Sequence, residues 1–152
     1  FRAGGRPENP DNVVREFERI EIGLFAQQTY IDRYGLPNGA TDFPKHRFAG
    51  TVDPNTRAVF QRWLHENVPA ECIAFRSNSM GTLAEAVLCG NGIGFLPREA
   101  ALERGDLVEI VPPDPDWLSM MWMVTHVDLH RSAKVQAFLK ELEHLCRTGD
   151  WL

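Results

Sequence analysis

The stretch RSNSMGTLAEAVLCGNGIGFLP, residues 76–97, decides the fold of this chain. A Ser-Asn-Ser turn leads into a predicted helix over residues 82–89, which ends at a Gly-Asn-Gly turn because glycine readily follows the last helical residue. The apolar run at residues 93–96 then predicts a short buried strand. A tight unit of turn, helix, turn and strand is typical of an α/β fold.

The sequence on both sides of this stretch continues the alternation of strands and helices. Alternating apolar residues predict a strand within residues 13–26. An apolar stripe at helical spacing predicts the clearest helix of the chain over residues 132–146. A second stripe predicts a helix over residues 53–67, capped by Asp53 or Asn55. Further helices are predicted over residues 27–34 and 98–105, and further strands over residues 47–51, 72–75, 107–112 and 118–127.

The order of these elements predicts the fold class. Strands that alternate with helices indicate an α/β architecture with a mixed, mostly parallel sheet. The length of 152 residues corresponds to one ordinary domain or to two very small lobes.

The composition is that of a globular protein that is soluble in water. Hydrophobic residues make up 43% and charged residues 24%, and the formal net charge is −5. The acidic balance argues against nucleic-acid binding by this segment, because contacts to phosphates need a basic face. The longest apolar run is far shorter than the roughly 20 residues that a membrane helix needs. No membrane partner is therefore expected.

The cysteines point to a reducing compartment. Cys72, Cys89 and Cys146 are odd in number and far apart, so they predict no disulfide framework. A cytoplasmic location is the simplest interpretation. We expect the three thiols to behave as small buried hydrophobic residues.

Ser77, Asn78 and Ser79 stand where a strand ends and a helix begins. A helix N-terminus offers unpaired backbone N–H groups and about half a positive charge, so it can receive a carboxylate or another small anion. Serine and asparagine at this position are also ordinary helix caps. The residues alone leave both interpretations open, a structural cap and a binding turn.

Catalytic and metal chemistry have weaker support in the sequence. A hydrolase would need Ser77 or Ser79 as nucleophile and His126 or His130 as base, but the sequence has no GxSxG elbow. The two histidines lie four residues apart without the HExxH pattern of zinc enzymes. No metal and no other cofactor are expected, and the hydrolase is kept as an alternative.

Three stretches resemble the effector-binding domain of LysR-type transcriptional regulators. FRSNSMGTLAEAVLCGNGIGFLPREAALERGDLVEIVP (residues 75–112) is similar to the second lobe of that domain. FRAGGRPENPDNVVREFERIEIGLFAQQTYIDRYGLP (residues 1–37) looks like the segment that leaves the first lobe, crosses a hinge and begins a helix. LSMMWMVTHVDLHRSAKVQAFLKELEHL (residues 118–145) looks like the return strand and the final helix. The resemblance covers essentially the whole chain.

The resemblance implies a type 2 periplasmic-binding-protein-like fold with two lobes. Residues 1–24 and 122–152 would be a remnant of the first lobe, and residues 25–121 would form a nearly complete second lobe. A complete member also carries an N-terminal winged helix-turn-helix, which is absent from this stretch. DNA would be contacted only through that domain. Complete members form homo-oligomers, so a dimer or tetramer is expected of the full-length protein.

The resemblance also implies where an effector binds. One turn of the second lobe contributes polar groups, the end of the first strand faces the cleft from the other side, and the strand after the glycines forms an apolar wall. The residues at the matching positions are Ser77, Asn78, Ser79, Met80, Arg2, Ala3, Phe95 and Leu96.

The sequence thus predicts the ligand-sensing domain of a bacterial LysR-type regulator and not an enzyme. A small molecule, expected to be an organic acid, would sit between the lobes and modulate DNA binding by the absent domain. Two alternatives stay open at this point. One is a periplasmic solute-binding lobe, which shares the two-lobe architecture, and the other is a small hydrolase that uses Ser77 or Ser79.

Overall fold

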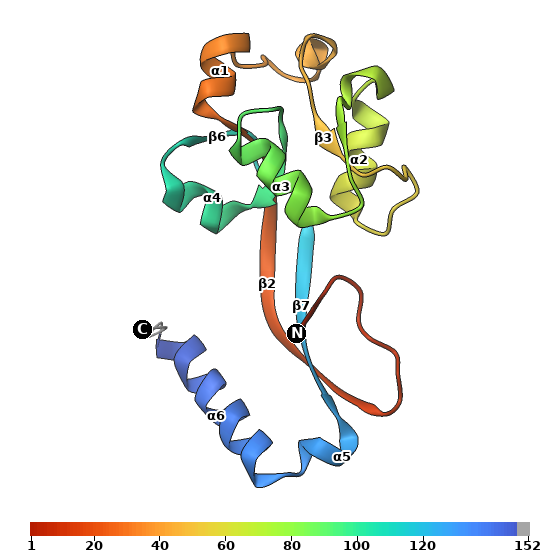
Figure 1. Cartoon of the computed structure of the whole chain (residues 1–152), viewed down its shortest axis with the longest axis vertical. Coiled ribbons are helices and arrows are strands. Elements are labelled where there is room, and N and C mark those ends of the chain that lie inside the picture. Colours follow the sequence, from red (N-terminus) through yellow and green to blue (C-terminus); the bar gives the residue numbers. More distant parts are fainter. Residues whose placement is uncertain (149–152) are drawn as a thin grey trace. The chain divides into compact units, whose positions relative to one another are not determined.

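The computed structural model describes residues 1–148, with side chains described as far as Leu145. Backbone contacts divide the chain into two units, whose elements are labelled in Figure 1. Unit 1 combines Phe1–Glu18 with Met120–Leu152, and unit 2 is Arg19–Ser119. The boundaries predicted from the sequence lie at residues 24/25 and 121/122. The assignment of the units to a lobe remnant and a second lobe stays a prediction.

Unit 1 contains a short antiparallel pair of strands. β1 (Arg2–Ala3) pairs with β7 (Leu118–His126), and Arg2 lies opposite Trp122. Trp122 is buried, and its indole N–H donates to the carbonyl oxygen of Gly4 over 2.7 Å. The strand predicted at residues 118–127 is therefore confirmed. Its indole hydrogen bond fixes the start of the chain on β7.

Two helices follow β7 in unit 1. α5 (Val127–His130) is a single turn, and α6 (Ala133–Thr148) confirms the helix predicted over residues 132–146. The backbone amide of Val135 donates to Ser132 Oγ over 3.3 Å. Ser132 is thus the N-cap of α6, because its hydroxyl satisfies one of the free amides at the helix start.

The α/β class is confirmed, but the prediction of a mostly parallel sheet is wrong. β2 (Asn12–Gln27) lies between β5 (Gly94–Pro97) and β6 (Leu107–Val111) and is antiparallel to both. The helix that connects β5 to β6 makes these two strands run in the same direction, as a crossover does. They do not pair with each other, because β2 occupies the position between them. β7 is also a neighbour of β2 in the sheet.

Parallel pairing is confined to a small sheet in unit 2. β3 (Ala49–Gly50) pairs in parallel with β4 (Phe75–Arg76), and Phe48 bridges Ile93 in the same sense. The buried strand predicted at residues 72–75 is mostly wrong. The chain there forms the 3₁₀ turn η2 (Ala70–Cys72), and β4 begins only at Phe75, which is exposed.

The helices of unit 2 gather around the unit 2 end of β2 (Figure 1). Three of them confirm the helices predicted over residues 27–34, 82–89 and 98–105. Gly105 follows the last of these with φ 70°, a left-handed conformation that glycine adopts without strain. The elements are α1 (Gln28–Tyr34), the 3₁₀ helix η1 (Ala40–Lys45), α2 (Val59–Asn67), α3 (Met80–Leu88) and α4 (Arg98–Arg104).

The helix predicted over residues 53–67 begins only at Val59, so the predicted caps Asp53 and Asn55 are wrong. The backbone amide of Asn55 donates to Asp53 Oδ1 over 2.9 Å, which closes a local turn. Such side-chain hydrogen bonds compete with helix formation. Residues 51–57 are therefore a loop, and the N-cap position of α2 is Ala58.

The core of unit 2 contains a cluster of aromatic side chains. Phe95 packs edge-on against Phe60 and Trp117, with ring centroids 5.2 and 5.0 Å apart. Trp63 packs edge-on against Trp117 at 4.9 Å. Such tilted arrangements are the favourable geometry for aromatic pairs. This cluster joins α2 to β5 and to the loop that precedes β7.

The cysteines only partly follow the prediction that all three are buried. Cys72 is buried, but Cys89, the residue after α3, is exposed. The side chain of Cys146 lies outside the described residues. Both described thiols are free. Within residues 1–148, none of the helices has the length and apolar character to cross a bilayer.

Candidate functional site

The N-terminus of α3 is held by two serine side chains. Ser79 is the N-cap, and its Oγ accepts a hydrogen bond from the backbone amide of Thr82 over 3.3 Å. Ser77 Oγ accepts from the amide of Ser79 over 3.1 Å. The amide of Ser77 donates to the carbonyl of Gly50 over 3.2 Å. The two serines therefore have the structural role that the cap interpretation predicts.

Three other amides at this helix end remain available. Among residues 1–148, no group accepts a hydrogen bond from the backbone amides of Asn78, Met80 and Gly81. Unpaired amides and the positive end of the helix dipole favour an anion at this position. The capping serines and the free amides thus belong to the same turn.

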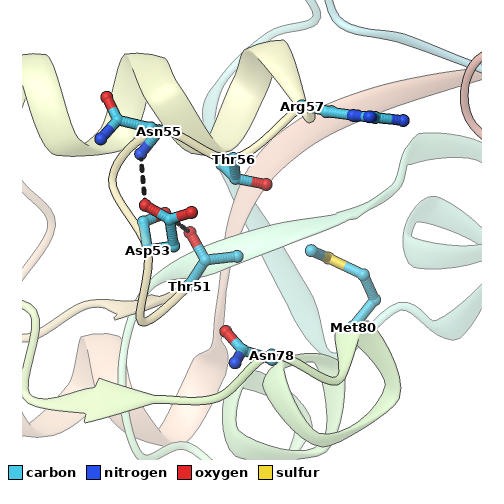
Figure 2. Close-up of a pocket in the computed structure, with 7 residues that line it drawn as sticks. All are labelled: Thr51, Asp53, Asn55, Thr56, Arg57, Asn78 and Met80. Atoms are coloured by element: carbon cyan, nitrogen blue, oxygen red, sulfur yellow. Dashed lines mark hydrogen bonds between the residues drawn. The ribbon is translucent and has the colours of Figure 1, made fainter.

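A pocket of about 470 Å³ opens beside this turn. That volume lies within the roughly 300–1,000 Å³ that is common for small-ligand sites. Figure 2 shows Asn78 and Met80 on the α3 side of the pocket, with Thr51 and Thr56 across from them. The lining residues are Thr51, Asp53, Asn55, Thr56, Arg57, Asn78 and Met80.

The opposite wall of the pocket is fixed to α2. Thr51 is buried, and its amide donates to Gln61 Oε1 over 3.1 Å. Its hydroxyl donates to the carbonyl of Asp53 over 3.1 Å. His65 Nε2 lies 3.0 Å from the carbonyl oxygen of Thr51. Hydrogen bonds with two residues of α2, Gln61 and His65, therefore position the start of the loop.

The pocket carries one side chain of each charge. Arg57 is exposed and forms no ion pair with any of the described residues. Asp53 Oδ1 accepts a hydrogen bond from the amide of Asn55, and Figure 2 shows the guanidinium of Arg57 turned away from Asp53. The unpaired guanidinium and the free amides of α3 can both hold a carboxylate, whereas Asp53 is partly occupied by its own loop.

The residues predicted from the sequence fall into three places. Asn78 and Met80 line the pocket, and Ser77 and Ser79 support the turn behind them. Phe95 and Leu96 are buried in the core of unit 2 and do not line this pocket. Arg2 and Ala3 form the exposed strand β1 in unit 1. The predicted effector contacts of these last four residues stay predictions.

The sequence pattern does not predict the pocket residues from Thr51 to Arg57. It predicts a helix from Asp53 onward, which would place these side chains on a regular surface. A local signal was present, because Pro54 follows Asp53 and precedes Asn55. Aspartate, proline and asparagine in succession are typical of a turn.

The side chains considered for hydrolysis have other local partners. Ser79 caps α3, and Ser77 Oγ accepts a hydrogen bond from the amide of Ser79. In unit 1, His130 Nδ1 lies 2.8 Å from Thr125 Oγ1, and His126 Nδ1 accepts from the amide of Asp128 over 3.3 Å. Each of these groups has a hydrogen-bond role within its own unit. No cluster of three or more potential metal ligands occurs among the described residues.

Solved structures of bacterial regulators share this fold. The regulatory domain of CrgA, a LysR-type transcriptional regulator from Neisseria meningitidis, gives a TM-score of 0.69 at 20% identity, over 91% of this chain and 71% of that one. The full-length virulence activator AphB of Vibrio cholerae gives 0.64 at 17% identity, over 94% and 50%. An effector binding domain from Citrobacter freundii with three substitutions gives 0.67 at 16% identity, over 95% and 72%.

The chain thus spans 50% of a full-length regulator and about seven tenths of the isolated regulatory domains. At these identities the likeness establishes the fold alone. A search of curated proteins gave no match. The family model described as "LysR substrate binding domain" matches residues 3–147. The chain therefore belongs to the LysR substrate-binding domain family, the effector-binding regulatory domain of LysR-type transcriptional regulators.

Proposed function

We propose that this chain senses a small organic acid, which binds in the pocket between the loop Thr51 to Arg57 and the start of α3. A LysR regulatory domain is a non-enzymatic part of a transcription factor. Family membership therefore sets aside both the hydrolase and the periplasmic solute-binding lobe. The role of the chain is binding and not turnover.

The observation that carries this proposal is the free amide set beside a pocket of suitable size. The amides of Asn78, Met80 and Gly81 donate to no described group, and the pocket next to them has about 470 Å³. Arg57 adds an unpaired positive charge at the edge of the same pocket. The rest of the lining is neutral polar groups, the thioether of Met80 and Asp53, whose Oδ1 already accepts from the amide of Asn55. Such a lining suits a small carboxylate with a partly apolar body.

The proposal for the whole regulator extends beyond this chain. The effector would modulate DNA binding by a winged helix-turn-helix within a homo-oligomer in the cytoplasm. A ligand shifts such an equilibrium only through unequal affinity for two conformations. Contacts of Arg2, Ala3, Phe95 and Leu96 with the effector remain part of this wider prediction.

A binding screen tests the proposal directly. The 152-residue chain is titrated with a panel of small mono- and dicarboxylates, and the melting temperature is measured. A ligand at about 100 times its Kd stabilises the folded chain by about 2.7 kcal/mol, which raises the melting temperature by several degrees. Amides of the same acids are the matched ligands without charge.

Two variants locate the site without disturbing the cap. Asn78→Ala and Arg57→Gln remove pocket side chains that hydrogen-bond to no described residue. Each is expected to weaken carboxylate binding about tenfold, the loss typical of a hydrogen bond to a charged group. Arg131→Gln makes the same charge change in unit 1 and is the control. Equal binding by all four proteins, or equal binding of acids and amides, would contradict the proposal.

A further inference from the structure

A second pocket of unit 2 lies against α2 and shares no residue with the first. Its volume is about 210 Å³, which is less than the roughly 300–1,000 Å³ of most sites for whole drug-sized ligands. It therefore suits a short molecule with one or two functional groups. The lining residues are Val59, Arg62, Trp63, Glu66, Asp114, Asp116 and Trp117.

Two tryptophans form the inner wall of this pocket. The ring centroids of Trp63 and Trp117 lie 4.9 Å apart, with an angle of 68° between the rings. Trp117 is only 3% exposed. Its indole N–H donates to no acceptor within residues 1–148, yet it is not sealed from solvent. Because Trp117 lines the pocket, a bound molecule can offer this N–H an acceptor in place of water.

Carboxylates surround the tryptophans. Glu66 on α2 and both Asp114 and Asp116 on the loop before β7 line the pocket. None of these three carboxylates forms an ion pair within the described part of the chain. Three carboxylates against the one guanidinium of Arg62 therefore leave the pocket with a net negative charge.

Arg62, the one cationic residue that lines the pocket, forms a hydrogen bond at its edge. Arg62 Nη1 donates to the carbonyl oxygen of Thr56 over 3.3 Å, which holds the guanidinium toward the loop before α2. The acidic loop is itself ordered, because the amide of Asp116 donates to Asp114 Oδ1 over 2.9 Å. The amide of Trp117 donates to the Asp114 carbonyl over 2.8 Å. The Asp114 carboxylate is thus placed before any ligand arrives.

These features select one kind of ligand. Among aromatic side chains tryptophan attracts cations most strongly, and nearby carboxylates reinforce that attraction. The indole N–H can donate to a bound molecule, and a neutral carbonyl suits it better than a carboxylate, which the three acids would repel. We propose that this pocket binds a small organic cation in which a guanidinium or alkylammonium group is joined by a short chain to a neutral carbonyl.

The ligand preference is opposite to that of the pocket beside α3. The acid proposed there is held by amides and Arg57, whereas the cation is held here by tryptophans and carboxylates. The second proposal does not rest on the first. Arg57 does not line the second pocket, so Arg57→Gln should weaken carboxylate binding without affecting cation binding. Either proposal can therefore fail while the other holds.

The test compares three probes on the unmodified chain by isothermal titration calorimetry. Nα-acetyl-L-arginine amide carries both the cation and the carbonyls and is expected to bind. Nα-acetyl-L-citrulline amide has nearly the same shape without the charge, and we expect it to bind at least about tenfold more weakly. Agmatine has the guanidinium without a carbonyl and is expected to fall between the two. Equal affinity for the arginine and citrulline derivatives overturns the proposal.

Variants then place the binding in this pocket. Glu66→Gln and Asp116→Asn keep the side-chain shapes at exposed positions, so the fold is preserved, and each is expected to weaken binding of the arginine derivative about threefold to tenfold. Glu103→Gln removes an exposed carboxylate of α4 and serves as the control. Unchanged binding in the Glu66→Gln, Asp116→Asn double variant overturns the proposal. The proposal is also overturned if long basic peptides bind and the arginine derivative does not.

Discussion

His65 Nε2 lies 3.0 Å from the carbonyl oxygen of Thr51 and 3.2 Å from its hydroxyl oxygen. Because a carbonyl only accepts hydrogen bonds, the imidazole N–H must point toward Thr51. This contact connects the last turn of α2 with the first residue of the pocket loop. The wall of the proposed effector pocket is therefore held by a side chain that does not itself line the pocket.

Replacement of this histidine should destabilise the loop. His65→Leu leaves the carbonyl of the buried Thr51 without its donor, and we expect a loss of about 1–3 kcal/mol in the free energy of unfolding. Urea denaturation followed by circular dichroism measures the change. Glu66→Gln alters the next residue of the same helix and should unfold like the parent. Equal midpoints for both variants would show that the hydrogen bond carries no stability.

The cap of α3 gives a second prediction. Ser79→Ala removes the acceptor of the Thr82 amide and is expected to cost about 0.5–2 kcal/mol of unfolding free energy. Ser79→Asp keeps an acceptor at the same place and should retain most of the stability, because aspartate caps helices about as well as serine. The measurement is again chemical denaturation. A loss in Ser79→Asp as large as in Ser79→Ala would rule out capping as the role of the hydroxyl.

Close packing at Gly94 predicts a strong effect of a single methyl group. A Cβ at this position of β5 would lie 2.6 Å from Val87 Cγ2 and 3.3 Å from the carbonyl oxygen of Ala49. Val87 is fully buried, so it has no room to withdraw. Gly94→Ala is expected to lower the free energy of unfolding by about 1–3 kcal/mol. Gly5→Ala, with no atom within 4 Å of the added carbon, should be nearly neutral in the same assay.

The buried His46 makes stability depend on pH. Its Nδ1 lies 3.2 Å from the hydroxyl of Tyr30, which accepts a hydrogen bond from the amide of Arg47. Burial lowers the pKa of His46 below its usual 6.5, with Asp42 opposing and Lys45 adding to this effect. The unfolded chain therefore takes up the proton more readily than the folded chain.

Stability should accordingly be complete above pH 6.5 and decline as the pH falls below it toward the lower pKa of the folded state. Urea unfolding at a series of pH values measures this slope. His46→Gln should flatten it in the same range. The carboxyl of Asp42, whose pKa is lowered mainly by its hydrogen bond with Lys45, acts only in a more acidic window below 3.8. An unchanged slope in His46→Gln would assign the effect to another group.

The sequence predicts those elements best whose signals are local. The helix after Ser132 and the unit from Ser79 to Leu96 form as expected, because a cap, an apolar stripe and glycine turns all lie within a few residues of each other. The antiparallel direction of the neighbouring strands could not be predicted from such local signals. It depends on β2 inserting between β5 and β6, and that pairing joins residues far apart in the chain.

The sequence predicts one of the two walls of the candidate site, the turn before α3, but not the loop that faces it. The turn with Asn78 and Met80 has a clear sequence signal, since it stands before a helix. The facing loop does not, because the apolar stripe of α2 obscures the turn at Asp53. Thr51 enters the site only through its hydrogen bonds to Gln61 and His65. Contacts of this kind depend on tertiary structure, which no local pattern of residues specifies.

β2 pairs with two strands that are synthesised much later than β2 itself, and this order affects how the new chain folds. Leu24 and Phe25 leave the ribosome long before their pairing partners, which are Phe95, Gly94 and residues of β6. Until then an apolar strand has both edges unpaired, and unpaired edges are sites of aggregation. Pairing over such sequence separations also slows folding. Newly made chains of this protein should therefore depend on chaperones more than its modest size suggests.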